Sequence, residues 1–152
     1  MDINTLQHQH QQLQLLHQYK KSYTHTPTKR ILIVNYEDDV NFALKLVLEE
    51  ENSFHVDSFN DPISALNNFK KGFYDLLIIG VVMPYMNGFE LSKQIRKIDD
   101  NVKICFLIAG EIPSKVRFDT LSGQGEEGYQ DKFIKLPIEN KVLIEQIDRI
   151  II

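Results

Sequence analysis

The stretch YDLLIIGVVMPYMNGFEL, residues 74–91, decides the fold of this chain. Its unbroken apolar run at residues 76–79 is typical of a parallel strand covered by helices on both faces. Pro84, Asn87 and Gly88 then supply the backbone conformations that a turn needs. After this turn, apolar residues recur three or four positions apart, as they do on one side of a helix. We therefore predict a strand, an exposed loop and a helix, with the loop at the edge where parallel sheets place functional sites.

Further strands and helices are predicted on both sides of this stretch. Apolar or alternating segments predict strands at residues 31–34, 54–59, 102–109 and 133–136. Helical spacing predicts helices that start near Val40, at Pro62 and at Ile138, the first of them capped by Asp38 or Asp39. Between residues 111 and 130, a proline and three glycines predict only a short or mobile helix. Strict alternation of strand and helix predicts an α/β, doubly wound parallel fold with right-handed crossovers.

Composition limits the classes of function. A chain of 152 residues with 43% hydrophobic content is expected to form one domain around one core. The net charge of −4 argues against a broad nucleic-acid surface. Cys105 is the single cysteine, so a reducing, cytoplasmic location is expected. No apolar stretch approaches the roughly 20 residues that a membrane span needs, and we expect no membrane contact.

The first 28 residues differ from the rest of the chain. Residues 1–28 hold six glutamines and four of the five histidines, and residues 29–152 form the predicted folded domain. One helical side of this extension would carry the apolar residues Leu6, Leu13, Leu16 and Tyr23. An isolated helix of this length is marginal in water. The sequence therefore favours a frayed helix or a disordered tail over a defined interaction helix.

The strand and loop quoted above resemble one known family. The run at residues 75–79, followed by Met83-Pro84 and Asn87-Gly88, resembles the third strand and following loop of receiver domains in two-component response regulators. The resemblance covers residues 29–152 and implies the flavodoxin-like, CheY-like sheet of five strands in the order 2-1-3-4-5. It also implies phosphorelay signal transduction, with a histidine kinase or a downstream effector as partner.

The residues that give such receivers their chemistry are replaced in this sequence. The family's paired acids, phosphoacceptor aspartate, Ser/Thr and lysine correspond here to Asn35, Tyr36, Gly80, Ile108 and Leu136. None of these residues is charged, whereas phosphoryl transfer to a carboxylate requires a nucleophile, a hard cation and donors for the phosphoryl oxygens. We therefore expect no catalytic residue, no metal site, no cofactor and no Mg²⁺ binding. The aromatic switch residue of the family is kept as Phe133.

These losses suggest a degenerate pseudo-receiver that acts independently of phosphorylation. We expect Tyr36, Ile108 and Leu136 to pack over Gly80 and to close the former pocket. Function would then lie on protein-interaction surfaces, since the chemistry is missing.

Two such surfaces stand out in the sequence. The loop residues Tyr85 and Met86 would be exposed, although a purely structural turn explains them as well. The last helix carries more apolar residues than one face needs, among them Ile144, Ile147 and Ile151. They could serve either the core or a homodimer contact.

Two alternatives stay open. A phosphorelay receiver phosphorylated at a non-standard residue would share the same fold. A flavodoxin-like cofactor-binding protein would need a phosphate-cradling loop after the first strand, but the loop at residues 35–39 is acidic and repels phosphate. No Ser–His–Asp set or metal-ligand cluster indicates an enzyme.

Overall fold

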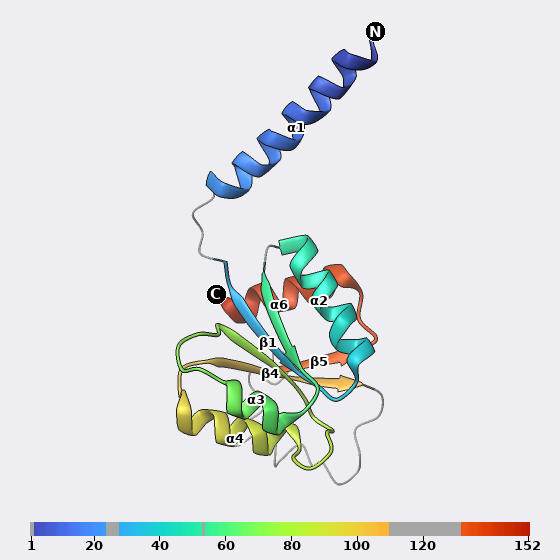
Figure 1. Cartoon of the computed structure of the whole chain (residues 1–152). Coiled ribbons are helices and arrows are strands. Elements are labelled where there is room, and N and C mark those ends of the chain that lie inside the picture. The colour runs from blue at the N-terminus through green and yellow to red at the C-terminus, as the bar shows by residue number, and fades with distance from the viewer. Residues whose placement is uncertain (1, 24–27, 53, 110–131) are drawn as a thin grey trace.

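The computed structural model of the chain describes residues 2–23, 28–52, 54–109 and 132–152. Its strands are β1 (Arg30–Val34), β2 (His55–Phe59), β3 (Leu76–Gly80), β4 (Lys103–Ala109) and β5 (Phe133–Leu136). All neighbouring pairs are parallel, in the order β2-β1-β3-β4-β5 (Figure 1). The predicted flavodoxin-like sheet is confirmed, and each strand lies within one residue of its predicted bounds.

Four of the five described helices cover the two faces of this sheet, and the first does not (Figure 1). They are α1 (Ile3–Tyr23), α2 (Asp38–Asn52), α3 (Pro62–Asn68), α4 (Gly88–Ile98) and α6 (Asn140–Ile151). Helices α3 and α4 pack on one face, and α2 and α6 pack on the other (Figure 1). Helix α2 begins earlier than predicted, so Asp38 and Asp39 lie in its first turn, where their charges favour the helix dipole, and not at its cap. The weak helix predicted at residues 111–130 lies outside the described residues.

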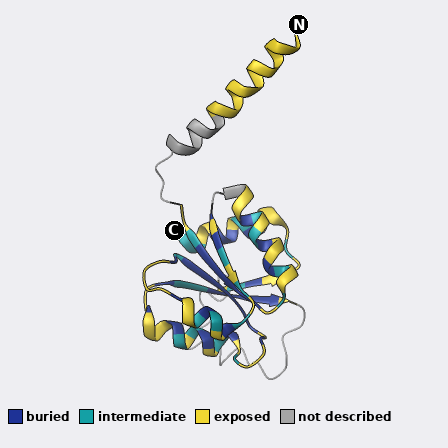
Figure 2. Ribbon diagram, in the orientation of Figure 1, coloured by how far each residue is buried: buried dark blue, intermediate teal, exposed yellow. Residues whose placement is uncertain are grey.

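The central strand β3 divides the core into two layers. All five of its residues are buried, as an uninterrupted apolar run between two helical layers requires (Figure 2). Leu77 and Ile79 pack toward α3 and α4, whereas Leu76 and Ile78 pack toward α2 and α6. The strand therefore ends at Gly80 with both sides of the sheet filled.

The N-terminal extension is helical. Helix α1 extends away from the folded domain, and the side chains of residues 2–16 are exposed (Figures 1 and 2). Within residues 2–16, the large apolar side chains are between 50% and 71% exposed. Whether it binds a partner stays a prediction.

The buried carboxylate of Asp99, directly after α4, links the end of this helix to the neighbouring loops by hydrogen bonds. Asp99 is 4% exposed and accepts hydrogen bonds from the backbone N–H groups of Gly72 (3.0 Å), Asn101 (2.9 Å) and Val102 (3.1 Å). These bonds, that from Gly72 foremost, hold the pKa of Asp99 below its ordinary value. Because the folded-state pKa is depressed, this stabilisation is present above about pH 4 and is lost as the pH falls through the folded-state pKa.

We expect Asp99→Asn to lower the free energy of unfolding at pH 7 by about 2 kcal/mol, because charge-assisted hydrogen bonds to three backbone donors are weakened. The variant should also lose less stability than the wild type between pH 7 and pH 3. Urea unfolding at both pH values measures this, with Asp100→Asn, at an exposed neighbour, as the control. Equal acid sensitivity of wild type and Asp99→Asn would contradict the assignment.

Candidate functional site

The carboxyl ends of the parallel strands meet at one edge of the sheet, where receivers carry out their chemistry. Strand β1 runs beside β3, with Val34 opposite Ile79. Asn35 follows β1 directly, and Gly80 is the last residue of β3. The fold therefore brings the first acidic position and the phosphoacceptor position of the family together.

The side chain of Asn35 fills the space beside Gly80. A Cβ atom added to Gly80 would lie 2.5 Å from Asn35 Oδ1 and 3.4 Å from Asn35 Cβ. The first distance is far below van der Waals contact, and the Asn35 side chain is only 4% exposed. In this conformation the amide of Asn35 occupies the place of a Cβ atom at position 80, so any side chain there requires the amide to move.

The backbone of Asn35 is held on both sides. Its N–H donates to the carbonyl oxygen of Phe59 (3.1 Å), and its own carbonyl accepts from Nδ2 of the buried Asn41 (2.7 Å). Asn35 Nδ2 and Asn41 Oδ1 are buried with no hydrogen-bond partner among the described residues. These groups are neutral amides, so the buried site holds neither the negative charge that attracts a hard cation nor a nucleophilic carboxylate.

The loop after β3 and the first residue of α4 lie close against the backbone of Gly80. Gly88 N–H donates to the carbonyl oxygen of Val81 (3.0 Å), and Asn87 Oδ1 caps α4 by accepting from the N–H of Glu90 (3.0 Å). A Cβ atom on Gly88 would overlap the carbonyl oxygen of Gly80. The predicted turn is present, but the left-handed backbone expected at Asn87 and Gly88 lies at Tyr85 instead (φ 70°), while Asn87 is extended with a φ of −73°. The glycine at position 88 is required by the close approach of α4 to β3.

The prediction that three other side chains cover Gly80 is wrong for two of them. Tyr36 is 45% exposed, and its hydrogen bond to the Glu37 carboxylate, together with the charge of that group, raises its pKa. Ile108 is buried in the layer of α3 and α4, on the face opposite to the one that position 80 shares with Leu76 and Ile78. Leu136 packs on the α2 and α6 side, the same side as position 80, but none of its atoms is among the three nearest to the free position on Gly80. The three heavy atoms nearest the free position on Gly80 all belong to Asn35, which the sequence did not indicate as the filling residue.

Phe133, the switch-like aromatic, is partly buried against other rings. Its centroid lies 5.7 Å from that of Phe106, which lies 4.7 Å from that of Phe89. The carbonyl oxygen of Phe133 accepts a hydrogen bond from Nε2 of Gln146 (2.6 Å), which joins β5 to α6. In this structure the ring is packed on the core beside α4.

The predicted interaction surfaces differ in exposure. Tyr85 is 97% exposed with a φ of 70°, while Met86 is partly buried against the core. Ile147 is fully buried, so its prediction as a surface residue is wrong. Ile144 and Ile151 are partly buried and pack against the same core layer. A helix that is apolar on several sides does not reveal from sequence alone which side faces the core.

Two carboxylates elsewhere on the sheet have hydrogen-bond partners of their own. Asp75 accepts from the backbone N–H of Arg30 (2.8 Å) at the opposite end of the sheet. Asp57 accepts a hydrogen bond from the Tyr74 hydroxyl (2.8 Å). Within the described ranges, His, Cys, Asp and Glu nowhere gather in threes that could hold a metal ion. In the same ranges, none of the helices combines the length and apolar character that crossing a bilayer requires.

Comparison with known proteins identifies similar chains. The model of the response regulator receiver domain matches residues 31–147. The response regulator receiver protein CpdR of Brucella abortus is 27% identical over 124 residues, covering 82% of this chain and 98% of CpdR. The transcriptional regulatory protein PcoR of Escherichia coli is 32% identical over 119 residues, covering 78% of this chain but only 50% of PcoR. Against several of its curated relatives, the chain spans about half of their length.

Solved structures agree with this match. The non-phosphorylated HemR receiver domain of Leptospira biflexa has a TM-score of 0.65 at 25% identity, covering 82% of this chain and 94% of that one. The chemotaxis protein CheY4 of Vibrio cholerae has a TM-score of 0.66 at 21% identity, covering 82% of this chain and 99% of CheY4. The second likeness shows the shared fold alone.

Proposed function

Because this chain belongs to the response regulator receiver domain family of two-component signalling, we propose that it is a pseudo-receiver that signals through protein contacts and not by accepting a phosphoryl group. One observation carries the proposal: position 80, where the family keeps its phosphoacceptor aspartate, is a glycine, and the neutral side chain of Asn35 packs beside it. The site thus lacks the nucleophile that phosphoryl transfer to a carboxylate requires.

The electrostatics of the site support the same proposal. In a receiver with several acids, like-charge repulsion between carboxylates raises their pKa values and is relieved when Mg²⁺ binds. Here the corresponding positions Asn35, Tyr36 and Gly80 bring no negative charge at neutral pH. We propose that the site binds no Mg²⁺, and that no ion-driven change of conformation starts there.

The partner in this proposal is a histidine kinase or a downstream effector, which would contact the loop at the carboxyl end of β3. Tyr85 presents a large, fully exposed ring from a left-handed backbone conformation that costs a non-glycine residue about 1 kcal/mol or more. Backbone strain of this kind often accompanies functional loops. A homodimer through α6 is proposed as a second contact, now without the buried Ile147.

Beryllofluoride with Mg²⁺ tests the proposal as a mimic of the phosphoryl group. We expect the melting temperature to stay unchanged, because the ligand has no site. A ligand present at a hundredfold excess over its Kd would stabilise by about 2.7 kcal/mol, which corresponds to a rise of several degrees. A rise of that size would overturn the proposal, and a receiver with an intact acidic site serves as the positive control.

Incubation with acetyl phosphate, followed by intact-mass measurement, tests the remaining alternative. We expect no gain of a phosphoryl group. A stoichiometric gain would show a non-standard acceptor and would contradict phosphorylation-independent signalling. Fragmentation of the modified chain would then locate the acceptor residue.

A further inference from the structure

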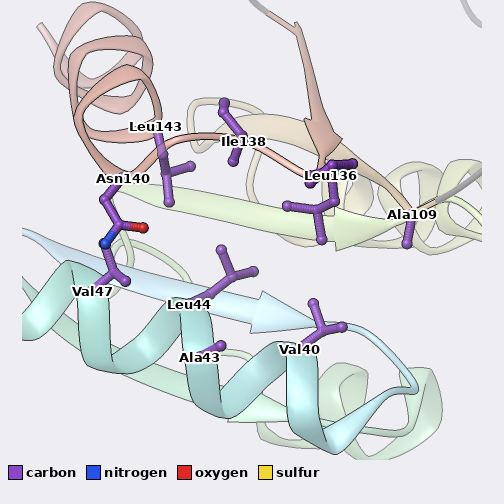
Figure 3. A pocket seen from close by; sticks show the side chains of 10 residues that line it. Val40, Ala43, Leu44, Val47, Ala109, Leu136, Ile138, Asn140 and Leu143 are labelled. Carbon is purple, nitrogen blue, oxygen red and sulfur yellow. The ribbon is translucent and has the colours of Figure 1, made fainter.

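An apolar groove lies between α2 and α6, near the carboxyl ends of β4 and β5 (Figure 3). Its volume is about 450 Å³. The side chains that line it are apolar apart from Asn140, and include Val40, Ala43 and Val47 of α2 and Leu143 of α6. Burying such a surface is favourable, so an open groove of this kind favours an apolar occupant.

Helix α1 carries a matching apolar side. Leu6, Leu13 and Leu16 are 50%, 62% and 55% exposed. Residues 3–19 include no Asp, Glu, Lys or Arg. A helix without tertiary contacts is marginal in water, because most helical stability in proteins comes from packing one face. An apolar, uncharged partner surface would therefore stabilise this helix.

The two surfaces agree in length and in polarity. Leu6 and Leu13 are seven residues apart, as are Val40 and Val47 of the groove wall, and seven residues of helix rise about 10 Å. Neither surface would bury a charge on contact, so docking would avoid the cost of desolvating an ion. The amide of Asn140 in the groove can hydrogen-bond the glutamine side chains of the helix.

We propose that α1 of one copy docks in the α2–α6 groove of a second copy, and that the exchange is reciprocal. In a single chain α1 points away from its own domain, so among the described residues its leucines stay exposed and the groove keeps an open side at the exposed Ala43 (Figure 1). A twofold dimer covers both surfaces twice, by exchange of the same element. This inference rests on the proposed function, in which the chain acts through protein contacts, and it names a second copy as one of those contacts.

Sedimentation of the full chain across a concentration series tests the dimer. We expect the double variant Leu13→Gln/Leu16→Gln to raise the dimer Kd by more than about a hundredfold, because two leucine side chains lose their burial at each of the two equivalent contacts. Ala43→Arg should also abolish the dimer by blocking the groove, and Ala43 is exposed, so the larger side chain leaves the core intact. Leu15→Gln, at an apolar residue 63% exposed on another side of α1, is the matched control and should leave the Kd unchanged.

Disulfide trapping identifies the occupant of the groove. A chain carrying Leu13→Cys is mixed with a chain carrying Ala43→Cys or Val47→Cys and is then oxidised. We expect a heterodimeric disulfide between the two chains, since such a bond forms only when the Cα atoms come within about 7 Å. The native Cys105 is fully buried and does not compete.

Other outcomes would overturn the inference. A wild-type chain that stays monomeric at every concentration would show that the proposed dimer does not form. A dimer that is insensitive to Ala43→Arg would show that α1 pairs with α1 and leaves the groove empty. An intramolecular disulfide in a chain carrying both Leu13→Cys and Ala43→Cys would show docking within one copy. None of these results would change the outcome of the phosphorylation tests, so failure of the dimer and failure of the proposed function are distinguishable.

Discussion

Gly88→Ala is expected to lower the free energy of unfolding by about 3 kcal/mol, at the upper end of the usual cost of overpacking. The added Cβ atom would overlap the carbonyl oxygen of Gly80 and would lie 3.1 Å from its carbonyl carbon. Both atoms belong to the backbone of the central, buried strand β3. This strand is paired with β1 and with β4, so it cannot shift away from α4. Urea unfolding measures the change.

The sign of this effect makes the test specific. Replacing glycine by alanine within a helix ordinarily stabilises it by up to about 1 kcal/mol. Ser92→Ala, in the same helix α4, is the control and should be close to neutral. A Gly88→Ala variant as stable as the wild type would show that α4 can move away from β3, and that the tight approach of the two backbones is not required.

Gly80→Asp is expected to destabilise the fold by about 2 kcal/mol and to leave the protein unphosphorylated by acetyl phosphate. The new side chain would collide with Asn35, and its carboxylate would be buried without the lysine and cation that balance it in working receivers. Urea unfolding and intact mass give the two measurements.

The collision predicts that the two positions are coupled. Gly80→Ala should cost about 1–3 kcal/mol alone and clearly less in the background Asn35→Ala, where the space has been vacated. Gly72→Ala provides the matched control, because a Cβ atom there meets nothing within 4 Å while the φ of 75° disfavours any side chain. The cost of this control should be the same in the wild-type chain and in the Asn35→Ala background. If Asn35→Ala fails to relieve Gly80→Ala, Asn35 is not what fills the site.

The sheet could be predicted from sequence because its signals are local. Residues 76–79 form an uninterrupted apolar run. A run of that length, followed by a turn, strongly favours a strand that is buried on both faces. The turn before α4 was equally clear, since Pro84, Asn87 and Gly88 cluster there, whereas the cap that Asn87 forms was not predicted. The start of α2 was less certain, because acidic residues favour both the cap and the first turn.

The details of the site depend on contacts between distant residues, which periodicity does not encode. Sequence reasoning identified Asn35 and Gly80 as altered positions but assigned the filling of the pocket to Tyr36, Ile108 and Leu136. The alternation of side chains across the sheet sends Ile108 to the layer of α3 and α4, and Tyr36 is 45% exposed, so neither fills the space beside Gly80. Ile147 was misplaced for a similar reason, since its burial is decided by which side of α6 meets the sheet.

The packing of Asn35 against Gly80 also bears on how such a protein evolves. A lineage that loses its aspartate to glycine can in principle regain it by mutation, as long as the vacated volume stays empty. Because the amide of Asn35 packs into that volume, a return from glycine to aspartate at position 80 alone is expected to lower the stability of the fold. Recovery of the family's chemistry would therefore need changes at both positions, which makes it a less accessible route than a new protein contact.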